Sequence, residues 1–150
     1  MNKDNLQSQG FSNFDWINSA FSAHPKVDPD NGDIFNIGTN TGSVVLMKAT
    51  KEMKKLCWTT IKLRNPQMMH DFCLAGDYVV FFEAPLRFSL KDLLWGNKFF
   101  INCLTFDESL SSLIHIYEKK SLEHVKTVEF ESFYSFHFTN GFSTADKIVM

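Results

Sequence analysis

Short stretches of alternating apolar and polar residues recur along most of the chain. A period of two is typical of strands that bury one face. The pattern predicts strands over residues 34–37, 43–48, 57–63, 69–74, 78–82, 112–117, 127–130 and 133–138, and the start of another over 147–150. Many short strands at spacings of about ten residues indicate an all-β sandwich, barrel or propeller.

Turn-forming residues separate these stretches. Asn31-Gly32 predicts a tight type I′ hairpin turn, because this pair accepts positive φ angles. Further turns are expected at residues 39–42, 75–77 and 140–141. The acidic stretch 28–33 could be taken for a calcium loop, but Gly32 falls where a ligand is needed and Thr39 replaces the final glutamate. We therefore interpret it as a turn.

One segment departs from the alternation. Leu90, Leu93, Leu94 and Trp95 predict a short amphipathic turn of helix within residues 86–106, and residues 99–101 extend its apolar surface. The first 14 residues are polar and rich in Asn, Gln and Ser. We expect residues 1–14 to be a frayed segment and residues 15–150 to form the domain.

Composition narrows the function classes. The 150 residues carry 15 Lys and Arg against 17 Asp and Glu, so nothing in the charge favours nucleic acid as a partner. A hydrophobic content of 44% excludes wholesale disorder. The 16 phenylalanines are an unusually large number, and they predict a β-rich core, an apolar ligand site, or both.

Targeting and cysteine signals are plain. The N-terminus lacks the apolar stretch of a signal peptide, and no apolar run approaches the roughly 20 residues that span a bilayer. Cys57, Cys73 and Cys103 are isolated, which is typical of small buried hydrophobes in a reducing compartment. We expect a cytoplasmic protein whose membrane contact, if any, is peripheral.

Histidines are the candidates for chemistry. No two of the five have the spacing of a local metal motif, so spacing alone favours structural roles. His70 and His137 lie in apolar stretches, where a buried polar ring needs a partner. His115 and His124 lie on a hairpin rich in Lys and Glu, and we expect both to be solvated.

Several stretches together closely resemble the carotenoid cleavage oxygenases. They are residues 22–29 (SAHPKVDP), 32–38 (GDIFNIG), 69–72 (MHDF), 77–82 (DYVVFF), 84–86 (APL) and 136–142 (FHFTNGF). They occur in the family's order, and the resemblance covers almost everything from Asp15 to Met150.

The resemblance implies a seven-bladed β-propeller and non-haem iron chemistry. Members of the family cleave a conjugated double bond of carotenoids, apocarotenoids or stilbene-like substrates with O2, and one branch isomerises retinyl esters instead. Four histidines hold one Fe(II) on the propeller axis. His24, His70 and His137 match the first three, and the fourth is expected beyond Met150. The family's supporting glutamates have no counterpart here, since Glu129 and Glu131 do not match them.

The resemblance also suggests where apolar molecules bind. Phe72, Phe136 and Phe138 flank ligand histidines and are candidates to line a polyene tunnel, with core packing as the alternative. A second set resembles the family's membrane-dipping patch at the tunnel mouth, with a buried loop over the blades as the alternative. This set comprises Phe88, Leu93, Leu94, Trp95, Phe99 and Phe100.

Length is the main departure from the family. Seven blades of about 40–50 residues need roughly 300 residues or more, so this chain supplies about three blades. We expect a partial propeller, an internal fragment of a dioxygenase that is inactive without a complementing propeller fragment. One alternative is a degenerate fragment that binds an apolar ligand or nothing. The other is an unrelated small β-domain.

Overall fold

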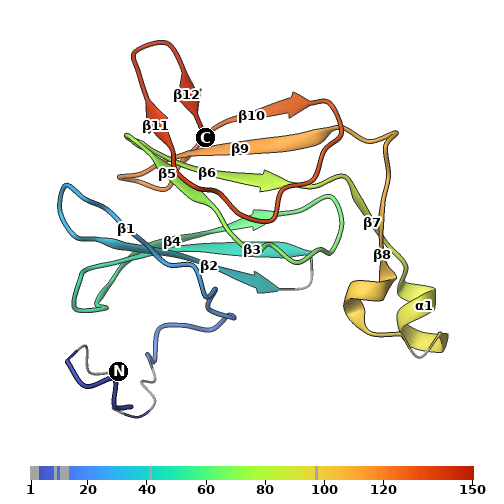
Figure 1. The fold of residues 1–150 in the computed structure, drawn as a ribbon, viewed down its shortest axis with the longest axis horizontal. Coiled ribbons are helices and arrows are strands. Elements are labelled where there is room, and N and C mark those ends of the chain that lie inside the picture. The colour runs from blue at the N-terminus through green and yellow to red at the C-terminus, as the bar shows by residue number, and fades with distance from the viewer. Residues whose placement is uncertain (1–3, 9, 11–13, 41, 97) are drawn as a thin grey trace.

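The computed structural model describes residues 4–8, 10, 14–40, 42–96 and 98–150, which form two four-stranded antiparallel sheets and two two-stranded ones (Figure 1). The first sheet runs in the order β1 (Lys26–Val27), β2 (Ile34–Asn40), β3 (Ser43–Ala49) and β4 (Lys55–Lys62). The second has the order β10-β9-β6-β5, built from β5 (Cys73–Ala75), β6 (Tyr78–Glu83), β9 (Ser112–Glu118) and β10 (His124–Phe130). The hairpin of β11 (Phe142–Ser143) and β12 (Ile148–Val149) follows.

The inner strands of the second sheet, β6 and β9, have buried residues on both faces. Val79 and Phe81 point toward the first sheet, where they join Phe35, Leu46 and other residues in one core cluster. The neighbouring residues of β6 point the other way, into a second cluster against which Ile148 of the terminal hairpin packs. Both faces of β6 are therefore apolar, and the strand reads as a continuous hydrophobic run.

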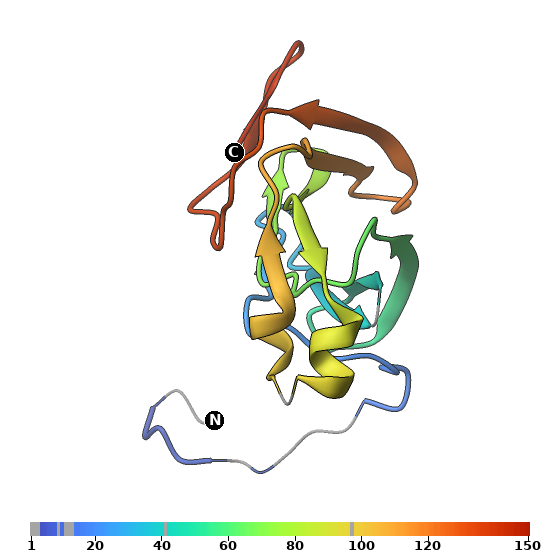
Figure 2. The same ribbon diagram turned by 90° about the vertical axis from the view of Figure 1, so that its right-hand side faces the viewer.

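Sheets stacked face to face in this way are the blades of a β-propeller. Each four-stranded sheet is a meander, and the β11–β12 hairpin begins a third layer beside β5 (Figures 1 and 2). Gly141 permits this approach, because a Cβ at that position would lie 2.9 Å from the carbonyl oxygen of Leu74. The expected partial propeller is confirmed, as two complete blades and the start of another within the described residues.

An insertion between β6 and β9 projects from the end of the second sheet (Figure 1). It contains β7 (Leu86–Phe88), α1 (Leu90–Trp95), η1 (Phe100–Cys103) and β8 (Leu104–Phe106). The predicted helical turn is therefore confirmed, and Ser89 caps it by accepting a hydrogen bond from the backbone N–H of Asp92. No residue of α1 is buried, and Trp95 and Phe99 are 76% and 81% exposed. Within the described residues, this insertion is therefore exposed rather than buried over the blades.

The prediction of a tight type I′ turn at Asn31-Gly32 is wrong, because the observed loop is longer. The connection from β1 to β2 spans residues 28–33, and the N–H of Asp28 donates to the carbonyl of Asp33 over 2.8 Å. Gly32 does take a positive φ of 79°. The loop is longer because the Asp28 carboxylate folds it by accepting from the N–H of Asp30.

The predicted strand over residues 69–74 begins only at Cys73, and the one predicted over residues 133–138 is absent. Residues 69–72 lie outside any strand and precede β5, and residues 133–138 form an irregular segment between β10 and β11. Thr41 of the predicted turn and residues 1–3, 9 and 11–13 of the expected frayed segment lie outside the described residues. No helix in the described part of the chain is long and apolar enough to cross a membrane.

Candidate metal centre

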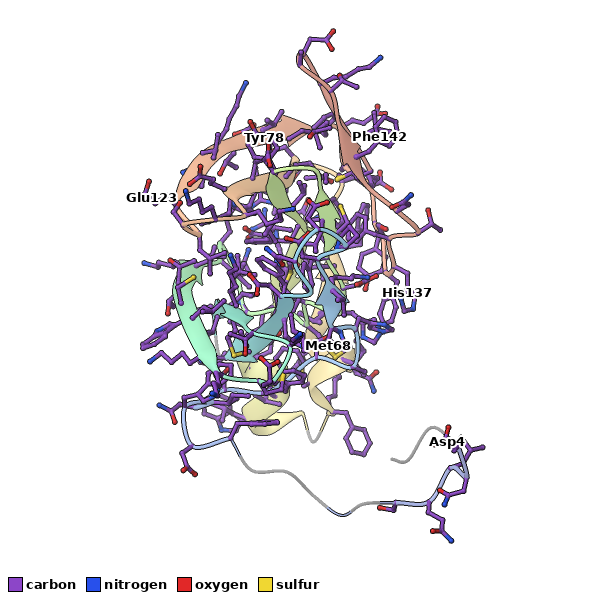
Figure 3. All side chains as sticks on the ribbon, turned by 90° about the vertical axis from the view of Figure 1, so that its left-hand side faces the viewer. Asp4, Met68, Tyr78, Glu123, His137 and Phe142 are labelled. Carbon is purple, nitrogen blue, oxygen red and sulfur yellow. The ribbon has the colours of Figure 1, made fainter. Side chains whose placement is uncertain are left out.

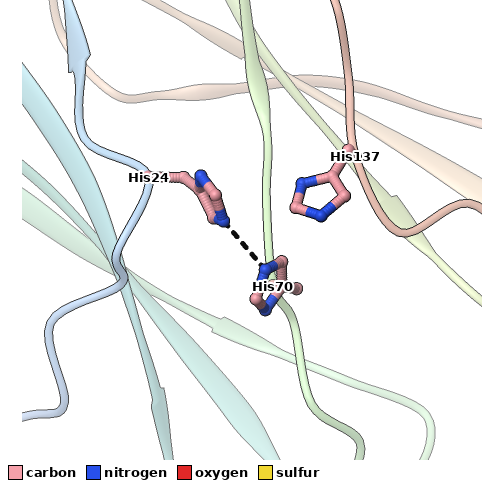
Figure 4. Close-up of side chains that lie close together, drawn as sticks. All are labelled: His24, His70 and His137. Atoms are coloured by element: carbon pink, nitrogen blue, oxygen red, sulfur yellow. Dashed lines mark hydrogen bonds between the residues drawn. The ribbon is translucent and has the colours of Figure 1, made fainter.

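His24, His70 and His137 converge although they come from three distant segments (Figure 4). His24 lies two residues before β1, and His70 lies three residues before β5. His137 lies in the segment that leads to β11 and projects at the surface, where 54% of its side chain is exposed (Figure 3). Each histidine therefore precedes the first strand of its own layer.

The ring nitrogens are close enough to share an ion. The Nε2 atoms of His24 and His70 are 2.8 Å apart, and one ligand atom from each of the three residues lies within 4.8 Å of the others. Two imidazole nitrogens bound to one ion at about 2.1 Å lie roughly 3 Å apart when adjacent and at most about 4.2 Å apart. The pair of His24 and His70 already meets this limit, and the exposed side chain of His137 lies beside it.

The chemistry of the donors also fits Fe(II). Imidazole is a good ligand for iron in its neutral form. Desolvation, followed by the neighbouring rings of His24 and His137, lowers the pKa of His70 below 6.5, against the opposing charge of Asp71. This environment keeps His70 neutral near pH 7, as metal binding requires.

Two polar side chains hold the first histidine segment against the rest of the site. The buried Asn36 of β2 accepts from the N–H of Ser22 over 2.9 Å and donates to its carbonyl over 3.0 Å. The hydroxyl of Ser22 donates to the carbonyl of His70 over 2.9 Å and accepts from the N–H of His24 over 3.2 Å. Ser22 thus joins the first two histidines through the backbone, a role that the sequence reasoning did not assign.

A buried carboxylate lies beside the cluster. The side chain of Asp71 is 2% exposed and pairs with the ammonium of Lys26 over 2.7 Å. Burial raises the pKa of Asp71, but the Lys26 ammonium and the backbone N–H groups of Phe138 and Phe72 outweigh it, so the pKa lies below 3.8. Asp71 is therefore ionised at neutral pH. The sequence reasoning missed it, although it directly follows His70.

The three candidate tunnel residues occupy different environments. The ring of Phe136 stacks on His70 with ring centres 4.2 Å apart, and Phe136 is 39% exposed. Phe138 is half-buried and packs against the second core cluster. Phe72 is fully buried in the cluster between the two large sheets. Among the three, only Phe136 contacts a histidine ring of the cluster.

The remaining histidines lie outside the cluster, and one prediction about them is wrong. His115 is not solvated but buried, with Nε2 2.9 Å from Glu83 Oε2 and Nδ1 3.2 Å from the hydroxyl of Thr127. It is buried because both faces of β9 pack against neighbouring layers, and Phe81 stacks on its ring. His124 is exposed, as expected.

Sequence comparisons identify related proteins along the whole chain. The family described as retinal pigment epithelial membrane protein matches residues 1–150. A carotenoid 9,10(9',10')-cleavage dioxygenase 1 from Pisum sativum is 30% identical over 150 residues, and one from Phaseolus vulgaris is 29% identical. In both cases the match covers 97% of this chain and 27% of the relative, so the chain spans about a quarter of these relatives.

Solved structures support the fold. Cobalt-substituted Synechocystis apocarotenoid oxygenase superimposes with a TM-score of 0.74 at 22% identity, over 87% of this chain and 29% of that one. The Pseudomonas brassicacearum lignostilbene dioxygenase gives 0.74 at 24% identity, over 89% and 28%. The chain therefore belongs to the retinal pigment epithelial membrane protein family, the carotenoid cleavage oxygenases that its sequence resembles.

Proposed function

We propose that this chain is part of a non-haem Fe(II) dioxygenase that cleaves a conjugated double bond of a carotenoid or apocarotenoid. The observation that carries the proposal is the convergence of His24, His70 and His137, whose ligand atoms lie within 4.8 Å of one another. The relatives named as carotenoid cleavage dioxygenases support the substrate class. A fourth histidine would come from outside these 150 residues.

Each part of the site has a distinct task in this reaction. When bound, Fe(II) supplies the activation of O2, and one oxygen atom ends in each of the two carbonyl products. His24, His70 and His137 would hold the ion through their neutral imidazole rings. Phe136 offers an apolar ring directly beside His70, where a polyene could lie without leaving polar groups unpaired. Phe138 lines the same small pocket as Phe136, whereas the position of Phe72 supports a packing role.

The exposed insertion supports peripheral membrane contact. Leu94, Trp95 and Phe99 are 58%, 76% and 81% exposed, and Lys91 and Lys98 flank them. Apolar and aromatic side chains beside lysines favour insertion into the lipid interface. Phe88, Leu93 and Phe100 belong to the same surface, and the rings of Phe88 and Phe100 lie 5.3 Å apart. Vesicle co-sedimentation should fall for Trp95→Ser combined with Phe99→Ser.

The terminal layer supports the need for a complementing propeller fragment. A groove of about 690 Å³ separates β9 and β10 from the β11–β12 hairpin, and its lining includes Val80, Ile114, Val128 and Ile148. The outer strand β10 is open, with Val125 and Phe130 each at least half exposed. Further strands would cover these apolar groups and enclose the site. We propose that the chain alone does not turn over.

Metal binding and product analysis test the proposal. The chain is purified without oxygen, loaded with Fe(II), assayed for bound iron, and supplied with an apocarotenal whose products are separated by chromatography. His137→Ala should lose iron, while His124→Ala, which changes an exposed histidine outside the cluster, should retain it. An absence of bound iron, even with the complementing fragment present, removes the metal assignment. Turnover by the lone chain contradicts the proposed inactivity.

A further inference from the structure

One carboxylate joins the three segments that carry the histidines. Oδ1 of Asp71 accepts from the N–H of Phe72 over 2.8 Å and lies 2.7 Å from the ammonium of Lys26. Oδ2 accepts from the N–H of Phe138 over 2.9 Å, and it lies 3.9 Å from Nδ1 of His137. Asp71 itself directly follows His70, Lys26 lies two residues after His24, and Phe138 directly follows His137.

We expect the contacts of the Asp71 carboxylate to be strong because the carboxylate is buried. The side chain of Asp71 is 2% exposed, so its charge depends on the donors that surround it. Hydrogen bonds to an ionised acceptor are about twice as strong as neutral ones. The N–H of Phe138 has no strand partner, since residues 133–138 are irregular. The Asp71 carboxylate therefore connects the His70 segment to the His137 segment at a point where no pair of strands does so.

The contacts also connect three different layers near the site. Lys26 begins β1 of the first blade, and Phe138 precedes β11 of the terminal hairpin. Asp71 lies between them, just before β5. A displacement of any one segment would separate a donor from this carboxylate. The same displacement would move a histidine, because each donor is within two positions of one.

We propose that Asp71 is a positioning residue, whose carboxylate fixes the relative placement of the three histidine segments before a metal binds. The proposal rests on the metal site described under the proposed function. Asp71 acts through the backbone of Phe138 and the ammonium of Lys26, and it is not itself a ligand. Groups that orient metal ligands typically change metal affinity by about 10-fold to 100-fold when they are altered.

The molecule contains a matched control. Asp28 is also a buried carboxylate, 1% exposed, and pairs with the ammonium of Lys119 over 3.1 Å. It accepts from the backbone N–H of Asp30, but the side-chain contacts described for it reach neither His70 nor His137. Asp28→Asn and Asp71→Asn therefore each remove a buried charge paired with lysine, and only the second disturbs the histidine segments.

The test measures binding of Co(II) to the full 150-residue chain by titration calorimetry and by its visible absorption. Asp71→Asn should weaken Co(II) binding about 10-fold or more and alter the absorption band, while Asp28→Asn should stay within about twofold of wild type. Where Asp71→Asn fails to fold, Lys26→Gln and its control Lys119→Gln are compared instead. Lys26→Gln should then give a smaller loss of the same sign.

A second readout needs no metal. Amide hydrogen exchange of residues 135–140 should be faster in Asp71→Asn than in wild type, with no such change in Asp28→Asn. Folded Asp71→Asn with unchanged exchange in this segment and unchanged Co(II) affinity overturns the proposal. A wild-type chain that binds no Co(II) but shows the exchange difference refutes the metal site while supporting Asp71 as the connection between the segments.

Discussion

Substitution of Phe72 by alanine separates a packing role from a role in binding substrate. The ring is fully buried in the core between the two large sheets, together with Phe35, Val79 and Phe81, which are also 0% exposed. A fully buried Phe→Ala change typically costs about 3–5 kcal/mol, because it removes the buried apolar surface and leaves a cavity. Natural domains have only about 5–15 kcal/mol in total, so the loss is large.

Phe136→Ala is the control for Phe72→Ala, because it removes the same ring from a different environment. This residue is 39% exposed and contacts the histidine cluster rather than the core, so its removal should cost about 1 kcal/mol or less. Urea unfolding followed by tryptophan fluorescence gives both free energies, and Phe72→Leu serves if the alanine variant does not fold. A free energy of unfolding for Phe72→Ala within 1 kcal/mol of wild type would refute the assignment of Phe72 to the core.

Three further predictions concern other buried groups. Burial raises the pKa of the Cys73 thiol to about 11, so a thiol reagent at pH 8 should modify half-buried Cys57 first and Cys73 only after unfolding. Glu83→Gln should lower the free energy of unfolding by about 1–3 kcal/mol, whereas the exposed Glu129→Gln should change it by less than about 0.5. Folding lowers the pKa of Asp71, because its hydrogen-bond donors outweigh the effect of burial. The ionised carboxylate therefore stabilises the folded state above about pH 4, and this stabilisation is lost as the pH falls through the lowered pKa. The stability difference between wild type and Asp71→Asn should therefore shrink below pH 4 in acid unfolding curves.

The strands of the two sheets were largely predictable from the sequence. Alternation located β2, β3, β4 and β9 to within a few residues, because each packs a regular apolar face. The short hairpin from Ala75 to Tyr78 follows from Gly76, whose φ is 59°. The helical insertion was equally clear from the spacing of its leucines.

The segments that carry the histidines were harder to predict. Residues 69–72 and 133–138 have strand-like sequences but pair with no strand, because side chains satisfy their backbone groups instead. The Asp71 carboxylate accepts the N–H of Phe138, and the hydroxyl of Ser112 accepts that of Phe133. Apolar periodicity does not register such contacts between distant residues. The three candidate ligands were predicted from the family resemblance, because their local spacing carried no signal.

His115 shows a related limit of local reasoning. Its hairpin is rich in Lys and Glu, which suggested exposure, yet Ile114 and Tyr117 are buried on opposite faces of the same strand. A strand that is apolar on both faces lies between two layers, so a histidine within it must be buried and paired. Glu83 on the adjacent strand β6 provides the partner.

Metal binding and catalysis place different demands on this fold. The three histidines are held by contacts within the described chain, through Asn36 and Ser22 on one side and Asp71 on the other. We therefore expect that binding of an ion does not require closure of the propeller ring. Cleavage of a polyene requires a dry, enclosed path for the substrate, but here His137 and Phe136 are open to solvent. We therefore expect this chain to bind iron without turning over substrate, and to become active when further blades cover its open face.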